Sequence, residues 1–171
     1  MAADPRSLPL TPDDLAAFIE RRGVRAEILH LPVETPTVED AARAVGTHPD
    51  RIVKSLLFLV DRSPTLVIAC GASPVSRRRM AAHFHISPKR IKLADPEATL
   101  SASGYPVGAL PPFGHRQPLP TLIDLRVLAQ DEVFAGGGSI RSLLRIGAQE
   151  LARVTQATAL DLVEESAADG S

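Results

Sequence analysis

The run of residues 52–60, Ile-Val-Lys-Ser-Leu-Leu-Phe-Leu-Val, limits what this chain can fold into more than any other stretch. It is β-branched or apolar almost throughout and carries one charge, which is typical of a strand buried on both faces. Because side chains alternate along a strand, Lys54 shares a face with Ile52, Leu56 and Phe58. An ammonium is seldom left among such residues unless it reaches water or meets an anion. Two interpretations follow: Lys54 extends into solvent from a rim, or it faces a polar cavity.

Composition narrows the class of protein. The 171 residues suffice for one domain with its own core, and a net charge of −1 gives no overall field that would attract nucleic acid or an anionic membrane. The single cysteine, Cys70, excludes an internal disulfide and fits a reducing compartment. No apolar run reaches the roughly 18 residues of a membrane span. We therefore expect a soluble, cytoplasmic protein that has no membrane contact. Its histidines are scattered along the sequence, so we expect no metal site, and we expect no cofactor.

Cap and turn residues divide the chain into alternating helices and strands. Helices are expected at 12–22, 38–45, 76–84, 96–103 and 149–154. Strands are expected at 24–31, 52–60, 65–70, 91–93, 121–125, 132–135 and 142–146. This irregular order predicts a mixed α/β fold, with one compact domain and a mixed, mostly antiparallel sheet flanked by helices. The domain is expected at 12–157, with a flexible N-terminus at 1–11 and an acidic flexible tail at 158–171.

Three features could carry chemistry: Lys54, a loop rich in glycine and proline at 104–114, and the segment Gly-Gly-Gly-Ser at 136–139. Glycines let backbone N–H groups approach a ligand closely, and prolines stiffen a loop so that its donors are preorganised. Together with a lysine, the two segments could surround a carbonyl or a phosphate. Taken singly, each is also typical of an ordinary turn. The triglycine matches neither a Walker nor a dinucleotide-binding fingerprint.

The amino-acid sequences of five segments, and their order along the chain, resemble those of one known family. They are Glu-Asp-Ala-Ala with Val-Gly at 39–46, Val-Lys-Ser-Leu-Leu-Phe at 53–58, Ile-Lys-Leu-Ala-Asp-Pro at 91–96, the loop at 104–114, and Val-Phe-Ala-Gly-Gly-Gly-Ser at 133–139. With these segments, which span nearly the whole domain, the chain resembles the YbaK family of aminoacyl-tRNA deacylases. That family is related to the editing insertion domain of bacterial prolyl-tRNA synthetases. The resemblance implies a YbaK-like fold.

The resemblance also implies an activity, the hydrolysis of the ester between a wrong amino acid and the terminal ribose of a tRNA. Lys54 matches the family's characteristic active-site lysine, and 108–112 matches its Gly-x-x-x-Pro loop. The implied substrate-binding residues are Thr37, Phe58, Gly108, Ala109, Pro112, Gly136, Gly137, Gly138 and Ser139. Ala109 stands where many members have a second glycine, and the basic residues that follow the triglycine in some members are absent. The amino acid therefore stays open among small or proline-like ones such as alanine, cysteine, serine or threonine.

The expected chemistry uses Lys54 to position the substrate. Lysine is a poor general base at neutral pH unless its pKa falls, but as an ammonium it can hold a phosphate or orient the ester. Backbone N–H groups at 108–112 would stabilise the developing oxyanion by roughly 3 kcal/mol per donor. Backbone or the substrate's ribose hydroxyl would position the attacking water, and Ser139 could orient that water. As a nucleophile, Ser139 lacks a base that the sequence suggests.

The expected partner is the acceptor end of an aminoacylated tRNA, with an aminoacyl-tRNA synthetase as a further candidate. Arg77, Arg78 and Arg79 form either a solvated face or a basic patch that contacts tRNA phosphates. The leading hypothesis is a free-standing deacylase that acts in trans on mischarged tRNA. Two alternatives stay open. One is a catalytically silent module on the same fold that binds tRNA or a synthetase, and the other is a hydrolase of another small ester or amide.

Overall fold

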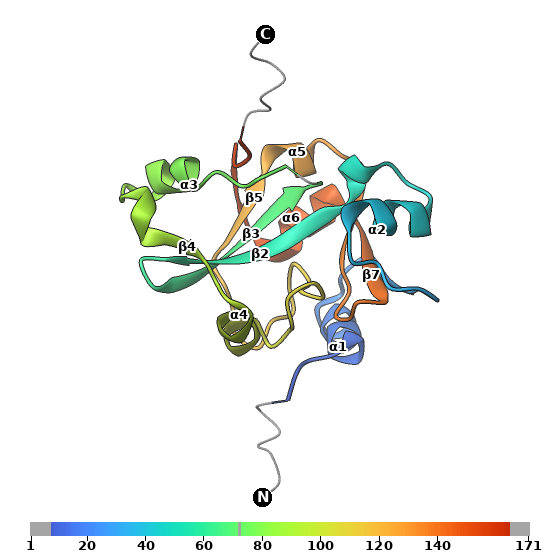
Figure 1. Cartoon of the computed structure of the whole chain (residues 1–171). Coiled ribbons are helices and arrows are strands. Elements are labelled where there is room, and N and C mark those ends of the chain that lie inside the picture. The colour runs from blue at the N-terminus through green and yellow to red at the C-terminus, as the bar shows by residue number, and fades with distance from the viewer. Residues whose placement is uncertain (1–7, 72, 165–171) are drawn as a thin grey trace, which may run out of the picture.

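Two β-sheets organise the computed structural model, which describes residues 8–71 and 73–164. The larger sheet has the strand order β4-β2-β3-β5-β8, and the smaller has the order β1-β7-β6. Figure 1 labels β2, β3, β4 and β5 of the larger sheet and β7 of the smaller one. The strands are β1 (Ala26–His30), β2 (Val53–Val60), β3 (Ser63–Cys70), β4 (Ile91–Leu93), β5 (Thr121–Asp124), β6 (Glu132–Gly136), β7 (Ser142–Gly147) and β8 (Thr158–Leu160). The outer parts of the predicted flexible ends, 1–7 and 165–171, lie outside the described residues.

Strand pairing is mostly antiparallel, as the sequence predicted, although it builds two sheets rather than one. β2 and β3 form a hairpin, and β4 adds to β2 in the antiparallel sense. β5 and β8 add to the other edge in parallel, while β1, β7 and β6 are antiparallel throughout. An isolated parallel bridge joins Ile52 to Phe134. The two sheets therefore meet where β2 begins, two residues before Lys54.

Polar caps start the helices at the predicted places. Thr37 Oγ1 accepts a hydrogen bond from the Asp40 N–H at 3.0 Å, and the Asp95 carboxylate accepts one from the Ala98 N–H at 2.7 Å, as expected of N-caps. The helices are α1 (Pro12–Arg22), α2 (Val38–Val45), α3 (Arg77–Phe84), α4 (Pro96–Ser103), α5 (Leu125–Leu128) and α6 (Ala148–Thr155), with 3₁₀ turns at Pro49–Arg51 and Pro88–Arg90. Within the described part of the chain, no helix is long and apolar enough to cross a membrane.

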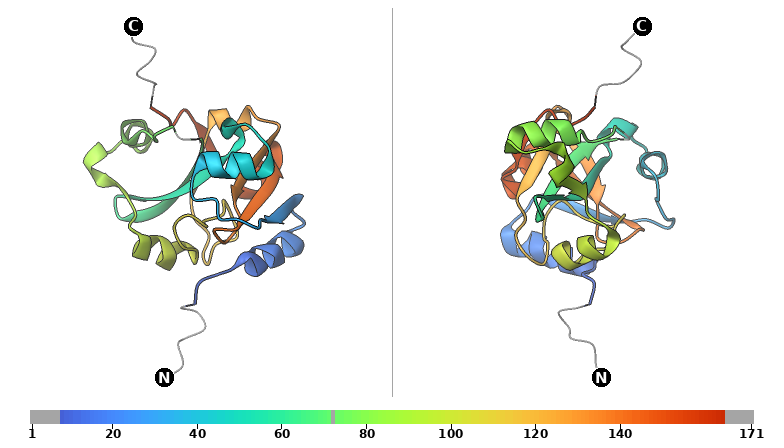
Figure 2. Two further views of the ribbon diagram at one scale, coloured as in Figure 1. Left: turned by 45° about the vertical axis from the view of Figure 1, so that its right-hand side comes forward. Right: turned by 60° about the vertical axis from the view of Figure 1, so that its left-hand side comes forward.

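The larger sheet is buried on both faces. Leu66, Ile68 and Ile123 point into the main core, which the smaller sheet and α1 complete. Val67 and Leu122 point the other way and pack beneath α3. In consequence α3 and α4 lie on opposite sides of this sheet, which the three views show (Figures 1 and 2). β2 thus has the two-sided burial that its apolar run predicted, and β3 beside it is buried on both faces as well.

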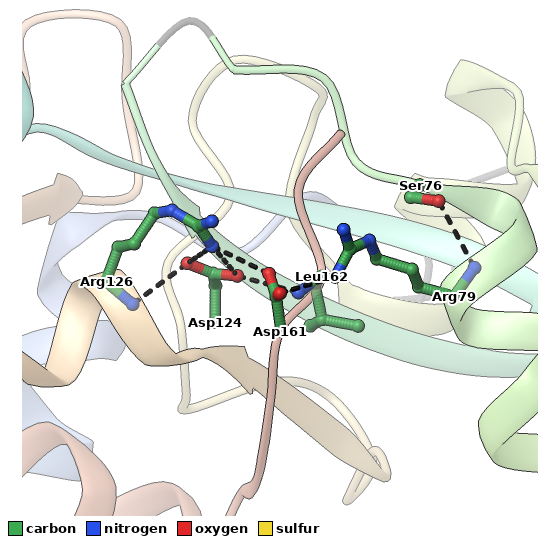
Figure 3. Close-up of polar contacts among 6 residues, drawn as sticks. All are labelled: Ser76, Arg79, Asp124, Arg126, Asp161 and Leu162. Carbon is green, nitrogen blue, oxygen red and sulfur yellow. Dashed lines mark hydrogen bonds and ion pairs between the residues drawn. The ribbon is translucent and has the colours of Figure 1, made fainter. Parts of the chain in front are cut away.

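The chain beyond residue 157 is part of the fold, so the predicted tail at 158–171 is wrong for its first seven residues. β8 pairs in parallel with β5, and Leu162 and Val163 are buried. The contacts of two aspartates hold residues 158–164 against the larger sheet (Figure 3). The buried Asp124 accepts a hydrogen bond from the Leu162 N–H at 2.7 Å, and Asp161 pairs with Arg126 at 2.8 Å. Asp161, one of the acidic residues that suggested a solvated tail, is therefore a structural partner of arginine side chains.

Candidate active site

A cavity of about 280 Å³ opens beside the first half of β2. Five segments of the chain contribute residues to its walls. They are 35–41, 52–57, 93–99, 107–110 and 135–143. Most of the lining side chains are apolar, and a few polar groups converge among them. A concave apolar site with a few placed polar groups is the usual form of a small-molecule pocket.

Lys54 lies in the wall of this cavity, as the second interpretation of its strand expects. The side chain is half-buried, and its Nζ donates a hydrogen bond to the Ser73 carbonyl oxygen at 2.6 Å. Burial lowers the pKa of Lys54 from its ordinary value of 10.5, because a low-dielectric surrounding disfavours the charged form. The bond to Ser73 fixes the position of the amino group. Lys54 is thus an oriented hydrogen-bond donor at the edge of an apolar pocket.

The two glycine-rich segments touch one another and form one wall. A Cβ added at Gly136 would lie 2.3 Å from the Leu110 carbonyl oxygen, so only glycine fits there. The Gly138 N–H donates to the Ala109 carbonyl oxygen at 2.9 Å, which ties the segments together. Leu110, Gly108, Gly136 and the loop's neighbour Ser139 line the cavity. The triglycine therefore sets the position of the loop at 107–110, and only its first residue faces the cavity.

Two backbone donors in this loop are available to a ligand. The N–H groups of Gly108 and Leu110 donate to no acceptor among the residues that the structure describes, and both residues line the cavity. The Ala109 N–H is occupied, since it donates to the Pro106 carbonyl oxygen at 3.1 Å. Pro111 and Pro112 have no N–H group. The predicted donors at 108–112 therefore narrow to Gly108 and Leu110.

Hydroxyl groups form the other polar part of the wall. Ser139 Oγ donates to Ser142 Oγ at 2.9 Å, and both residues line the cavity. Ser142 Oγ lies 3.3 Å from Nδ1 of His30 on β1. Thr37 also lines the cavity, but its hydroxyl oxygen accepts the capping hydrogen bond of α2. Ser139 and Ser142 are thus the hydroxyl groups of this wall that continue into a hydrogen-bonded chain.

Several residues predicted to bind substrate lie elsewhere. Phe58 is 3% exposed and belongs to the core cluster beneath α3, so its assignment to an amino-acid pocket is wrong. Ala109, Pro112, Gly137 and Gly138 are buried and lie behind the cavity wall. They support the wall without forming part of its surface. Of the predicted set, the cavity brings together Lys54, Thr37, Gly108, Gly136 and Ser139.

The three arginines predicted to bind nucleic acid stand at the start of α3 and do not line the cavity. Arg77 and Arg78 are exposed. Arg79 is less exposed and pairs with Asp161 (Figure 3), which gives it a structural partner. The exposed arginines that could form a basic surface at the start of α3 are therefore Arg77 and Arg78.

Some cavity residues escaped the sequence prediction. Leu93, Ala94 and Thr99 line it from the junction of β4 and α4. Ser142 could have been noticed as a second hydroxyl three residues after Ser139, but its neighbour His30 lies 112 residues away in sequence. Within the described residues, no group of three or more histidine, cysteine, aspartate or glutamate side chains could hold a metal ion.

Comparison with protein families matches residues 33–154 to the aminoacyl-tRNA editing domain. Among known proteins, the chain is 25% identical over 126 residues to the uncharacterized protein YwhH of Bacillus subtilis (strain 168), covering 73% of this chain and 78% of that protein. It is 32% identical over 85 residues to the proline--tRNA ligase of Thermotoga sp. (strain RQ2), covering 48% of this chain and 14% of that enzyme. The shared segment is therefore a small part of the synthetase.

Among solved structures, the chain resembles one described as a candidate trans-editing enzyme for prolyl tRNA synthetase, with a TM-score of 0.83 and 30% identity. That match covers 96% of this chain and 100% of the other. The family match extends over more than half of the chain and includes every segment of the cavity wall. The resemblance seen in the sequence is confirmed, and the chain belongs to the aminoacyl-tRNA editing domain family.

Proposed function

We propose that this chain is a trans-acting aminoacyl-tRNA deacylase, which hydrolyses the ester of a mischarged tRNA carrying a small or proline-like amino acid. The observation that carries the proposal is the cavity of about 280 Å³ in which Lys54 shares a wall surface with the unpaired N–H groups of Gly108 and Leu110. A chain of this family needs such a site to bind an aminoacyl ester. The candidate trans-editing enzyme with the same fold supports action on a separate tRNA.

Lys54 positions the substrate in this proposal. Its amino group is held at the cavity edge by the Ser73 carbonyl, where it can donate to an ester, ribose or phosphate oxygen of the acceptor end. The Gly108 and Leu110 N–H groups stabilise the oxyanion that forms when water attacks the ester carbonyl. Removing one oxyanion donor from an enzyme typically costs about 3 kcal/mol of transition-state stabilisation. No side chain forms a covalent intermediate with the amino acid.

The amino acid is selected by the apolar part of the cavity. Val38, Ala41 and Leu143 bring small or branched aliphatic surfaces to the lining. Such walls exclude what is too large, but they separate residues that differ by one methylene only about 10- to 200-fold. We therefore propose that the site works as a size sieve for small amino acids. This limit on discrimination is the reason for testing several esters rather than one.

The experiment that tests the function is a deacylation panel. tRNAs esterified with alanine, cysteine, serine, threonine and proline are incubated with the wild type and with Lys54→Ala, and the loss of aminoacyl-tRNA is followed over time. We expect the wild type to hydrolyse at least one mischarged tRNA, and Lys54→Ala to be slower by about 100-fold or more. Arg43→Ala is the matched control, because Arg43 is an exposed cation on α2, beside the cavity but outside its lining.

Three results would contradict the proposal. Full activity of Lys54→Ala would remove Lys54 from the mechanism. No hydrolysis of any ester by the wild type would favour the silent binding module, and Lys54 would then be tested for tRNA affinity. Equal hydrolysis of free aminoacyl esters and aminoacyl-tRNA would favour a hydrolase of other small esters.

A further inference from the structure

A hydrogen-bonded chain leads from the cavity wall along one face of the smaller sheet to an exposed histidine. Ser139 Oγ and Ser142 Oγ are 2.9 Å apart, and Ser142 Oγ is 3.3 Å from His30 Nδ1. His30 and Ser142 are directly opposite one another in the β1–β7 pairing, so their side chains share one face. Ser142 is 3% exposed, whereas His30 is exposed. The chain therefore joins a buried wall of the cavity to a ring in contact with solvent.

The direction of donation runs outward along this chain. The Ser139 hydroxyl oxygen accepts from the Arg141 N–H at 3.3 Å, and its own proton points to Ser142. Among the residues that the structure describes, the acceptor within reach of the Ser142 proton is His30 Nδ1, in the tautomer that carries its proton on Nε2. The turn that holds both serines is closed by the Ser142 N–H, which donates to the Ser139 carbonyl oxygen at 3.2 Å. The geometry is that of a proton relay that ends at an imidazole.

The His30 residue is exposed to solvent. It is also among the residues that line an outer cleft between the smaller sheet and α2. The charged residues that share this cleft are Glu27, Arg51, Glu132 and Arg145. Arg145 is paired with Glu132 at 2.9 Å. Lys54, in contrast, is a donor held by a carbonyl and is poorly placed to accept a proton.

We propose that His30 is the terminal proton acceptor for the water that attacks the ester, acting through Ser142 and Ser139. This inference rests on the proposed deacylase function. In the attack step, the water oxygen bonds to the ester carbonyl carbon as one water O–H bond breaks. That proton passes to Ser139 Oγ, the Ser139 proton passes to Ser142 Oγ, and the Ser142 proton passes to His30 Nδ1. The result is an imidazolium and a tetrahedral oxyanion.

The collapse of this intermediate reverses the relay. The bond between the carbonyl carbon and the ribose oxygen breaks, and the proton returns from His30 along the two hydroxyls to the ribose oxygen. The sum of the steps is ester plus water giving the amino acid and a tRNA with a free hydroxyl. His30 does not touch the substrate, so its part is that of a positioning residue that receives a proton through others.

The test uses the mischarged tRNA that the wild type hydrolyses fastest in the deacylation panel. We expect His30→Ala to lower kcat by about 100-fold, the range typical of general base catalysis, with little change in KM. His30→Asn keeps a hydrogen-bond acceptor for Ser142 but no basic nitrogen, so its kcat is expected to stay low. The double variant of His30→Ala with Ser142→Ala should be no slower than either single variant, because residues that act as a unit are not additive.

Chemical rescue separates proton transfer from a structural role. Because His30 is exposed, imidazole added to the buffer can reach the place of the removed ring in His30→Ala and is expected to restore part of its kcat. It should not restore Ser142→Ala, in which the relay itself is interrupted. His83→Ala, which removes an exposed histidine of α3, is the matched control and should keep the wild-type rate. Thermal unfolding of each variant checks that the fold is intact.

The possible failures are distinguishable. A wild-type kcat in His30→Ala, or a full recovery in His30→Asn, would overturn the relay and leave the deacylase function in place. If the wild type hydrolyses no ester of the panel, the proposed deacylase function is wrong, and so is the proposed relay.

Discussion

Lys54 keeps an amino group at the wall of a largely apolar cavity. A polar group in such a place costs free energy unless it is hydrogen-bonded, and the Ser73 carbonyl supplies that bond. The bond also reduces the number of positions that a long, flexible side chain can take. Lys54 therefore holds its amino group in a fixed position at the cavity wall, which is what the proposed function requires of it.

Arg77 and Arg78 lead to a prediction on tRNA affinity. Both are exposed on α3, and no carboxylate of the described residues forms an ion pair with either one. If they contact phosphates, the double variant Arg77→Ala with Arg78→Ala should bind tRNA more weakly. The slope of log K against log salt concentration should shrink by about 1 for each arginine. Filter binding of uncharged tRNA over a range of salt concentrations measures this.

A control on the opposite side of the molecule makes the result specific. Arg21 and Arg22 of α1 are also two adjacent exposed arginines, and α1 lies far from α3 (Figure 1). Their double alanine variant should keep both the affinity and the salt slope. An unchanged slope in the α3 variant would contradict the predicted contact and leave Arg77 and Arg78 as a solvated face.

Individual side chains show how far the sequence could locate the site. Lys54 was found because a charge in an apolar strand is conspicuous. By alternation, Phe58 lies on the same face of β2 as Lys54, and it was therefore predicted to line the pocket. The cavity, however, borders only the first half of the strand, and α3 covers the second half. Which part of a strand face is covered depends on elements distant in sequence. Local periodicity carries no information about that.

The close approach of the glycine segment to the loop at 107–110 gives a second prediction. In Gly136→Ala the new Cβ would meet the Leu110 carbonyl oxygen at 2.3 Å and the carbonyl carbon at 2.8 Å. Both are backbone atoms, so the loop must shift. A displacement of about 1 Å can cost about 100-fold in rate, and we expect kcat of deacylation to fall by that order. Overpacking should also lower the free energy of unfolding by about 1–3 kcal/mol.

Gly147→Ala is the comparison for this variant. A Cβ at Gly147 would find its nearest backbone atom at 3.7 Å, and the residue lies outside the cavity wall. It should therefore lose little stability and keep the wild-type kcat. A folded Gly136→Ala protein that deacylates at the wild-type rate would show that the loop position is irrelevant to catalysis.

Elements with their own caps and apolar periodicity were predictable, whereas those defined by distant partners were not. α2 carries a capping threonine and a terminating glycine, and both act as predicted. β8 has three residues, and its pairing with β5 is parallel. Its stability also depends on Asp124, which binds the Leu162 N–H from 38 positions away. Nothing in the local composition of residues 158–164 reveals that partner, so the segment looked like an acidic tail.

A contact between residues 25 and 150 joins the start of β1 to α6. Glu150 of α6 is 5% exposed, and its carboxylate accepts a hydrogen bond from the Arg25 N–H at 2.7 Å, just before β1. It also pairs with Arg153. Since β1 carries His30 and pairs with β7, whose first residues line the cavity, this anchor supports the strand pair beside the cavity.

Glu150 therefore makes stability depend on pH. Hydrogen bonds from Arg153 and from the Arg25 backbone hold the pKa of Glu150 well below its ordinary value of 4.5. Its contribution is complete above the pKa of the unfolded chain and is lost as the pH falls towards the lower pKa of the folded state. At pH 7, Glu150→Gln should lower the free energy of unfolding by about 2 kcal/mol, the scale of hydrogen bonds to a charged group.

The free energies of unfolding of the wild type and of Glu150→Gln should become more similar at acidic pH. Urea unfolding at pH 7 and at pH 3 should show a smaller difference at pH 3, because Glu150 takes up a proton in the unfolded chain below its ordinary pKa of 4.5, while its lowered pKa keeps it ionised in the folded protein. Glu20→Gln, which alters an exposed carboxylate of α1, is the control and should follow the wild type at both values. A difference between wild type and Glu150→Gln that is equal at pH 7 and pH 3 would mean that shape, and not charge, makes Glu150 stabilising. In that case the anchor of β1 would rest on packing between α6 and the sheet.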